Sequence, residues 1–168
     1  MHRRTFVRAS VGTVAMSAFE RKRYEPFLGS WSLVSYEQVL PSGQVLRPFG
    51  DSPSGLILYQ ANRYMSAQIS VRSPARFASD DSFQATAEEA GGAWRTYFGY
   101  WGTFKVDTEK GVVVHRVEGS SFANWIGTEQ VRHFRFDGGN RLILETEDSS
   151  GRFRVIWQRR AAESNGRS

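Results

Sequence analysis

The sequence predicts an all-β protein: a closed up-and-down antiparallel β-barrel of about eight strands with one short helix. Short runs rich in β-forming residues recur along most of the chain, and almost every run is joined to the next by a connection of hairpin length. The 16 glycines among 168 residues suit the tight turns that such hairpins require. We expect closure into a barrel because consecutive hairpins leave no exposed edge only when the sheet closes on itself.

The strands are expected in order along the chain, with turn signals between them. Pro41-Ser42-Gly43 is a turn, Ala61-Asn62-Arg63 is a connection of hairpin length, and Asp137-Gly138-Gly139-Asn140 separates two further runs. The runs that we expect to form strands are Ser30–Leu40, Gln44–Pro48, Gly55–Gln60, Tyr64–Val71, Gly99–Val106, Val112–Glu118, Glu129–Phe136, Arg141–Glu147 and Arg152–Arg159.

One segment, Asp80–Phe98, departs from the β pattern and is expected to hold the helix. Thr86-Ala87-Glu88-Glu89 has the pattern of a capping box, and apolar residues then recur at helical spacing. The pair Gly91-Gly92 weakens the helix by about 1 kcal/mol for each glycine, so the helix needs docking to persist. Two placements are open: a lid or plug at the barrel mouth that carries Trp94 and Tyr97, or a cover for an open sheet edge.

The chain is predicted to form one domain, 27–160, between two short terminal segments. Segment 1–26 is basic, and its Arg3-Arg4 pair, followed by Phe6-Val7 and a weakly apolar run, resembles a twin-arginine export signal. We therefore expect export to the periplasm; the alternative is a cytoplasmic protein with a frayed basic tail. Segment 161–168 is polar and is expected to be disordered.

Composition excludes several kinds of site. The sequence has no cysteine, which removes disulfides, thiolate catalysis and cysteine-ligated zinc. It has three histidines, one of them His2, so we expect no metal site and no cofactor. Three of the five net positive charges come from Arg3, Arg4 and Arg8, so we expect no clustered basic face for nucleic acid. No stretch is long enough to span a membrane, and the sequence predicts no particular oligomeric state.

Period-two alternation predicts which side chains face the barrel interior. One inward set begins with Gln130 and Arg132. It continues with Phe134 and Phe136, so it grades from polar to aromatic, as expected for a wet mouth and a dry floor. His133, on the opposite face of that strand, is expected to point outward. The same alternation places the following residues inward: Met65, Ala67, Ile69, Val71, Tyr100, Gly102, Phe104, Val106, Val113, His115 and Val117.

The two ends of the predicted barrel carry a characteristic pair of motifs. Gly29-Ser30-Trp31 opens the first strand, and Arg159 ends the last. A G-x-W start with a terminal arginine resembles the lipocalins and their relatives, in which the tryptophan lies at the closed end of the barrel and the arginine packs across it. A guanidinium over an indole gains about 1 kcal/mol of cation–π energy. Gly29, Trp31 and Arg159 are therefore expected to close the barrel.

The chain between these ends also resembles the bacterial and fungal lipocalin-like domains, from Phe27 to Arg160. The resemblance implies the barrel fold and a small apolar or amphipathic ligand inside it. Members of that group include parts of secondary-metabolite pathways, and distant calycins bind ligands or catalyse cyclisation and isomerisation, so the fold alone does not fix an activity. The similar stretches are Gly29–Tyr36, Tyr64–Ala67, Arg76–Ser79, Thr86–Ala90, Val117–Ser120 and Asn124–Thr128.

Two groups of polar residues are candidates for chemistry. His115 near Glu118 could act as a general base, because the pKa of a histidine is tunable to neutral pH; the alternative is a buried histidine bonded to its neighbours. The two residues lie on opposite faces of a strand unless a bulge near Gly119 turns one of them. Arg132 inside an apolar barrel would be a costly unpaired charge, so we expect it to meet a carboxylate, either Glu118 or one on a ligand.

Three functions follow from these patterns. The first is binding of a small, largely apolar molecule inside the barrel, for carriage or sequestration. The second is a cofactor-free isomerase, cyclase or hydratase of a secondary-metabolite-type substrate, with His115 and Glu118 as catalytic residues. The third is a structural exported domain with a filled core. The residues expected to bind the ligand are Met65, Trp94, Tyr97, Tyr100, Asn124, Trp125, Gln130 and Arg132.

Overall fold

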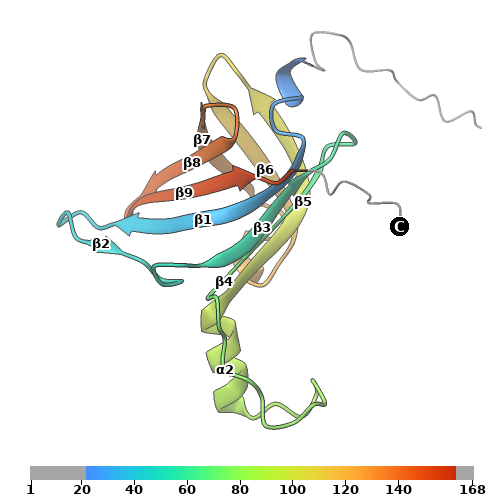
Figure 1. Cartoon of the computed structure of the whole chain (residues 1–168), viewed down its shortest axis with the longest axis vertical. Helices are drawn as coiled ribbons and strands as arrows, with labels where there is room; N and C mark the ends of the chain where they lie inside the picture. Colours follow the sequence, from blue (N-terminus) through green and yellow to red (C-terminus); the bar gives the residue numbers. More distant parts are fainter. Residues whose placement is uncertain (1–21, 162–168) are drawn as a thin grey trace, which may run out of the picture.

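A computed structural model describes residues 22–161, which form one nine-stranded antiparallel sheet that curls into a barrel (Figure 1). The predicted export signal falls mainly on residues outside this range, and so does the predicted disordered tail. Within residues 22–161 no helix is long and apolar enough to cross a lipid bilayer.

Every strand predicted from the sequence is present, with ends within two residues of those expected. Two helical elements interrupt the hairpins: the helix α2, Ala87–Thr96, before β5, and the 3₁₀ helix η1, Ala123–Trp125, before β7. The strands are β1 Gly29–Val39, β2 Val45–Leu46, β3 Ser54–Tyr59, β4 Tyr64–Ser70, β5 Tyr97–Asp107, β6 Val112–Ser120, β7 Glu129–Asp137, β8 Arg141–Asp148 and β9 Gly151–Arg159.

Strand β1 closes the barrel because it pairs on both of its sides. Along one side it pairs with β9, from Trp31 opposite Arg159 to Val39 opposite Arg152. Along the other side it pairs first with β3 and then with β2. The ring therefore contains eight strands, and β2 is an additional strand at its rim. The predicted closed, up-and-down, antiparallel barrel is confirmed.

A β-bulge in β1 changes which of its residues face inward. The register with β9 shifts between Leu33 and Ser35, which leaves Val34 as the extra residue. Leu33 is buried before the bulge, and after it Tyr36 stands opposite Val155 and faces the interior. Without the bulge, strict alternation would place Tyr36 on the outside of the barrel.

The barrel wall is split between β7 and β8. Strand β7 pairs with β6 through its first half, 129–133, but it pairs with β8 only through its second half, 133–137. Across the gap, the end of β8, 146–148, pairs only with β9. The two strands therefore diverge toward one end of the barrel, and no ladder of backbone hydrogen bonds joins them there.

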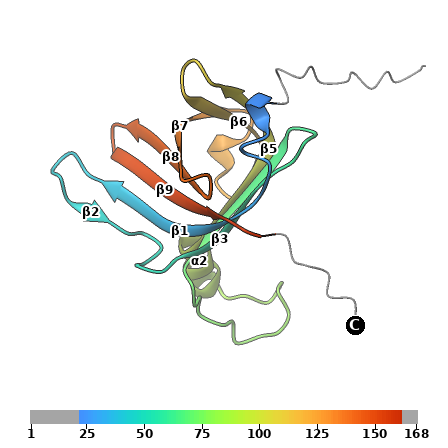
Figure 2. The same ribbon diagram turned by 45° about the horizontal axis from the view of Figure 1, so that its top comes forward.

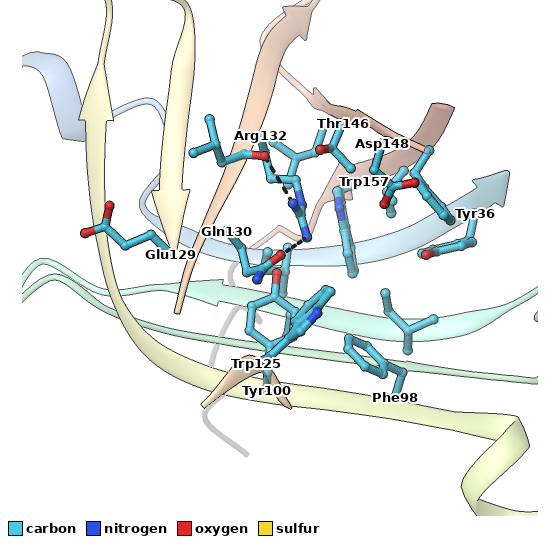
Figure 3. Close-up of a pocket in the computed structure, with 17 residues that line it drawn as sticks. Tyr36, Phe98, Tyr100, Trp125, Glu129, Gln130, Arg132, Thr146, Asp148 and Trp157 are labelled. Carbon is cyan, nitrogen blue, oxygen red and sulfur yellow. Dashed lines mark hydrogen bonds between the residues drawn. The ribbon is translucent and has the colours of Figure 1, made fainter. Parts of the chain in front are cut away.

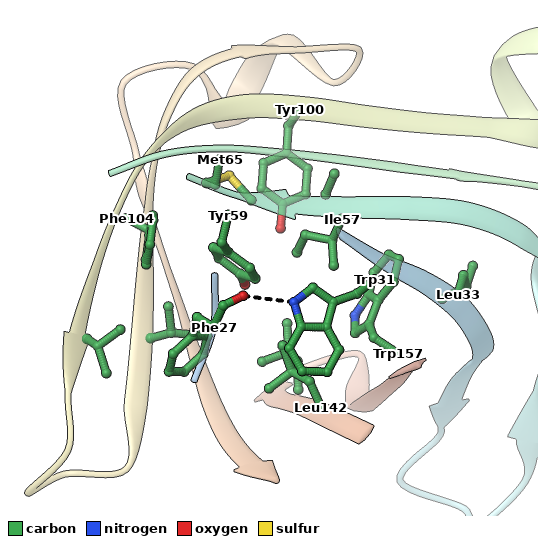
Figure 4. Packing of buried hydrophobic residues seen from close by; sticks show 14 of the residues in the cluster. Phe27, Trp31, Leu33, Ile57, Tyr59, Met65, Tyr100, Phe104, Leu142 and Trp157 are labelled. Atoms are coloured by element: carbon green, nitrogen blue, oxygen red, sulfur yellow. Dashed lines mark hydrogen bonds between the residues drawn. The ribbon is translucent and has the colours of Figure 1, made fainter. Parts of the chain in front are cut away.

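The opposite end of the barrel is filled by aromatic side chains around Phe27 (Figure 4). The ring of Phe27 meets Tyr59, Phe134 and Phe136 edge-on, at centroid distances of 5.5, 4.9 and 5.1 Å. Its carbonyl oxygen accepts a 2.8 Å hydrogen bond from the indole N–H of Trp31. This end is therefore the dry floor that the sequence predicts, with Phe134 and Phe136 facing inward.

Trp31 and Arg159 close the floor as predicted. The Cζ atom of Arg159 lies 4.0 Å from the centre of the Trp31 ring. The same guanidinium donates to the carbonyl oxygens of Leu28 and Pro26, at 2.8 and 2.6 Å. Gly29 has a φ of 114°, a conformation that favours glycine, where the chain enters β1. The arginine thus joins the segment before the first strand to the end of the last.

The helix α2 begins at the predicted capping box but makes little contact with the barrel beyond its last turn, where the Trp94 indole N–H donates to the Ser121 carbonyl oxygen at 3.4 Å. The Thr86 hydroxyl oxygen accepts from the Glu89 N–H at 3.2 Å, and the Glu89 carboxylate accepts from the Thr86 N–H at 2.8 Å. The helix then projects away from the barrel beyond the ends of β4 and β5 (Figures 1 and 2). Both predicted placements, a plug in the mouth and a cover for a sheet edge, are therefore wrong.

The composition of α2 explains why it projects. The helix has no buried residue, and Gly91-Gly92 interrupts its apolar face, so it offers little surface for docking. It also passes directly into β5 at Tyr97, without a loop that would fold it back. Trp94 and Tyr97 remain 59% and 46% exposed.

Replacing Arg159 with alanine is expected to lower the free energy of unfolding by about 2 kcal/mol, because it removes a cation–π contact and two hydrogen bonds from a charged donor. Urea unfolding measures this change. Arg160→Ala is the matched control, since Arg160 is exposed, and it is expected to change the free energy by less than about 0.5 kcal/mol. Equal losses in the two variants would contradict the role of Arg159 in closure.

Candidate functional site

A cavity of about 390 Å³ lies inside the barrel, between the aromatic floor and the split in the wall (Figure 3). Its volume is in the range of pockets that bind small organic molecules. Ile57 and Trp157 belong both to its lining and to the buried core, so they form the boundary between cavity and floor. The other aliphatic lining residues are Ala67, Ile69, Val131, Leu144 and Val155.

Three aromatic rings form one wall of the cavity. Trp125, at the end of η1, meets Phe98 and Tyr100 edge-on, with ring centroids 4.9 and 5.4 Å apart. Phe98 and Tyr100 come from β5, two residues apart on the same face of the strand. Rings packed edge-to-face hold one another in place. The three rings therefore form one continuous, largely apolar surface.

Arg132 is the one cation among the described residues that line the cavity. Its guanidinium donates to the carbonyl oxygen of Val131 at 3.1 Å and to the amide oxygen of Gln130 at 3.3 Å. Its Cζ atom lies 5.4 Å from the centre of the Trp125 ring. Arg132 forms no ion pair with a carboxylate in residues 22–161. The expected partner Glu118 is exposed on the outer face of β6, so that pairing was wrongly predicted.

Two carboxylates stand at the rim of the cavity, and both residues are exposed. Asp148 accepts hydrogen bonds from the hydroxyl and the backbone N–H of Ser150, which hold the pKa of Asp148 below its usual value. Glu129 carries its carboxylate on the side away from Arg132 (Figure 3). Both acids are therefore solvated, and neither compensates the guanidinium by contact.

A buried chain of polar groups, Tyr59–His115–Tyr100, lies behind the cavity wall. The hydroxyl of Tyr59 is 2.8 Å from Nε2 of His115, and the hydroxyl of Tyr100 is 2.9 Å from Nδ1. Of these three residues only Tyr100 lines the cavity. Burial, assisted by the charge of Arg132, lowers the pKa of His115 to about 3. Burial also raises the pKa of Tyr100 to about 12, so at neutral pH the imidazole is neutral and Tyr100 is protonated.

The burial of Tyr59 favours the tautomer of His115 that is protonated at Nδ1. The Tyr59 hydroxyl has no other hydrogen-bond partner within the described part of the chain. Its hydrogen is therefore paired when the hydroxyl donates to Nε2. In this tautomer Nδ1 of His115 donates to the Tyr100 oxygen. The hydroxyl hydrogen of Tyr100 is left for a group inside the cavity.

The indole N–H of Trp157 is a second donor that faces the cavity. Trp157 is 1% exposed, and its Nε1 atom has no hydrogen-bond partner in residues 22–161. Figure 3 shows the nitrogen end of this indole turned toward the side of the cavity that holds Arg132. Most buried polar groups are hydrogen-bonded, so this N–H marks a place for an acceptor atom.

The cavity opens to solvent through the split between β7 and β8. Glu129 and Val131 have outward-facing side chains, with Val131 45% exposed, yet both line the cavity together with their inward neighbours. Residues from both faces of a strand can line one cavity only where the cavity passes beside that strand. Thr146 and Asp148 line it from the other edge of the gap. The gap is therefore the mouth of the cavity.

The structure brings together half of the residues predicted to bind a ligand. Met65 is buried in the core and does not line the cavity. Asn124 is exposed on η1, and Trp94 and Tyr97 lie on or beside the projecting helix. The predicted residues that do line the cavity are Tyr100, Trp125, Gln130 and Arg132.

The structure does not bring His115 and Glu118 together. A bulge is present, since the register between β5 and β6 shifts between Trp101 and Gly102, but it leaves the Glu118 side chain exposed. His115 is fully buried, and both of its nitrogens bond tyrosine hydroxyls. Of the two interpretations of His115, the structure agrees with the buried histidine that is hydrogen-bonded to its neighbours and not with the general base beside Glu118.

Alternation would have found some of the remaining cavity residues. Applied to β8 and β9, it places one face of each strand inward, including Leu144 and Trp157. The inward position of Tyr36 depends on the bulge in β1, and the place of Val131 in the cavity lining depends on the split between β7 and β8. Alternation alone predicts neither. The lining residues that were not predicted as ligand contacts are Tyr36, Ile57, Ala67, Ile69, Phe98, Glu129, Val131, Leu144, Thr146, Asp148, Phe153, Val155 and Trp157.

Comparison with known proteins agrees with this architecture. A family model described as a lipocalin-like domain matches residues 28–160. The chain is similar to the 4'-hydroxy-3'-methoxypropiophenone carrier protein of Aspergillus oryzae, with 38% identity over 80 residues, which cover 44% of this chain and 72% of that protein. A redesigned β-barrel of known structure shares 10% identity with this chain at a TM-score of 0.43, over 83% of this chain and 96% of its own.

His115 is expected to make stability depend on pH. Because its pKa is about 3 in the folded protein and its ordinary value is 6.5, the unfolded chain binds more protons between these values. The stabilisation is complete above about pH 6.5 and is lost as the pH falls, by at most about 1.4 kcal/mol per pH unit.

Urea unfolding of the wild type and of His115→Gln, from about pH 7 to about pH 4, measures this slope. Glutamine does not titrate but still offers the two tyrosines a donor and an acceptor. The free energy of unfolding is expected to fall more steeply with acid in the wild type. Parallel slopes would mean that His115 is not held neutral by the fold.

Proposed function

This chain belongs to the lipocalin-like domain family, and on that premise we propose that it binds and carries a small, largely apolar aromatic molecule inside the barrel. The observation that supports this proposal is the cavity of about 390 Å³, lined by aromatic rings and aliphatic side chains. Transfer of an apolar molecule from water to such surfaces is favourable. The floor is sealed, and the split between β7 and β8 provides a route of entry.

The relative from Aspergillus oryzae supports the aromatic character of the ligand. Its name describes a carrier of an aromatic ketone that also bears a hydroxyl and a methoxy group. By analogy with this relative, we propose that the ligand of the present chain is a ring with oxygen substituents. The wall of Trp125, Phe98 and Tyr100 suits a planar ring, and the hydroxyl hydrogen of Tyr100 suits an oxygen on that ring.

The catalytic and structural alternatives receive less support. His115 offers no free nitrogen, and with a pKa of about 3 it is a poor proton acceptor at neutral pH. Any exchange of a proton with a ligand would have to pass through the hydroxyl of Tyr100. A filled core, in turn, does not fit an interior that holds a cavity of this volume.

Filling the cavity with a side chain tests the proposal. Ala67 is buried and lines the cavity. We expect the wild-type chain to bind 2-acetylnaphthalene, a neutral aromatic ketone, saturably in isothermal titration calorimetry. Ala67→Phe is expected to weaken this binding by about tenfold or more, because the phenyl ring occupies space that the ligand needs.

Ser66→Phe is the matched control, since it adds the same ring at the neighbouring position, whose side chain points to the other face of β4. Its affinity is expected to stay within about threefold of the wild type, and thermal unfolding checks that both variants fold. If the wild type shows no saturable binding, or if folded Ala67→Phe binds as well as Ser66→Phe, the ligand does not lie inside the barrel.

A further inference from the structure

Three of the polar side chains that line the cavity present hydrogen-bond donors to its interior. Arg132 presents guanidinium N–H groups, Trp157 an indole N–H, and Tyr100 a hydroxyl hydrogen. The amide oxygen of Gln130 already accepts from Arg132, and its amide nitrogen donates to the Thr128 hydroxyl at 2.9 Å. A ligand that pairs with these donors therefore carries acceptor oxygens.

The guanidinium of Arg132 favours an acceptor that carries charge. A guanidinium has five N–H groups in a planar fork that matches the two oxygens of a carboxylate. Here its two hydrogen-bond acceptors, from Val131 and Gln130, are neutral, and it lies against the face of Trp125; the charge of Asp148 at the rim acts on it without an ion pair. A positive charge that is half-buried without a counter-ion in contact stabilises an anion that enters the same cavity.

Trp157 and Tyr100 add donors whose positions are fixed. Trp157 is packed between floor and cavity, so its N–H cannot turn away to reach water. The Tyr100 oxygen lies 2.9 Å from Nδ1 of His115, and in the tautomer protonated at Nδ1 its hydroxyl hydrogen is left for the cavity. A ligand without oxygen atoms would leave both donors desolvated and unpaired, which costs free energy.

The acids of the rim oppose an anion only weakly. Glu129 and Asp148 are the carboxylates among the lining residues, and both are exposed to water. Solvent screens their charges more strongly than it screens the half-buried Arg132. The Asp148 carboxylate also accepts two hydrogen bonds from Ser150, which hold it at the turn between β8 and β9.

We infer that the ligand of this cavity is an aromatic acid, whose carboxylate accepts hydrogen bonds from Arg132 and from the Trp157 indole. Its ring lies against the wall of Trp125 and Phe98, where the Tyr100 hydroxyl binds a second oxygen on the ring. This inference rests on the proposed function, since it concerns the same cavity. It goes beyond that function because a neutral ketone offers Arg132 no charge, whereas a carboxylate offers it two charged acceptor oxygens.

A pair of ligands of the same shape tests this inference. 2-Naphthoate and 2-acetylnaphthalene differ only in a carboxylate oxygen that replaces a methyl group, and calorimetry at neutral pH gives the affinity of each for the full chain. We expect the wild type to bind 2-naphthoate about tenfold or more tightly than the ketone. Arg132→Gln is expected to remove most of this preference, with less than about a threefold effect on the ketone.

Two further variants separate charge from packing. Arg135→Gln is the matched control, because Arg135 lies on the same strand and its side chain is exposed on the outer face; we expect it to change neither affinity. Asp148→Asn removes a rim charge of opposite sign and is expected to tighten 2-naphthoate binding by about two- to threefold without changing the ketone.

A spectroscopic measurement keeps the inference testable if Arg132→Gln does not fold. In a proton–nitrogen correlation spectrum of the wild type, the indole N–H of Trp157, assigned by its loss in Trp157→Phe, is expected to shift downfield when 2-naphthoate binds. Equal affinities for the two ligands, or an unmoved Trp157 signal with bound 2-naphthoate, would overturn the aromatic acid while leaving barrel binding intact. Absence of binding by both ligands would overturn the proposed function itself.

Discussion

The pairing of β1 with β9 is the constraint on which the rest of the structure depends. It converts a series of hairpins into a ring and removes the two edges that an open sheet would expose. Trp31 and Arg159 lie opposite each other in this pairing, so the residues that close the ring also seal its floor. Because the ring has eight strands, its interior is just wide enough for a packed core and one small ligand.

The interior is divided along the barrel. At one end Phe27 and the rings around it fill the space, and at the other end β7 and β8 diverge and the space stays open. The Tyr59–His115–Tyr100 chain lies where the two regions meet. An imidazole in an apolar core would be costly without partners, and the two tyrosines supply an acceptor and a donor for its neutral form. The polar chain therefore stabilises the core at one end and presents a hydrogen to the cavity at the other.

The strands, their order and the closing residues could be predicted from the sequence because each depends on local signals: β-forming runs, turn residues and a period of two. The inward direction of Arg132 follows from the same period. The features that could not be predicted depend on how separate elements meet in three dimensions. A bulge in β1 turns Tyr36 inward, the divergence of two strands brings Val131 to the cavity, and α2 lacks the apolar surface that would dock it. Trp157 was missed although alternation along the last strand would have placed it inward.

The gap between β7 and β8 places several cavity-lining residues away from the contacts that hold the fold together. The floor and the β1–β9 ladder maintain the ring, whereas Arg132, Thr146 and Asp148 stand on strand segments that share no backbone hydrogen bonds across the gap. Replacing a side chain there breaks no ladder and opens no hole in the packed floor. Substitutions at the gap can therefore change the shape and charge of the cavity mouth while the architecture persists.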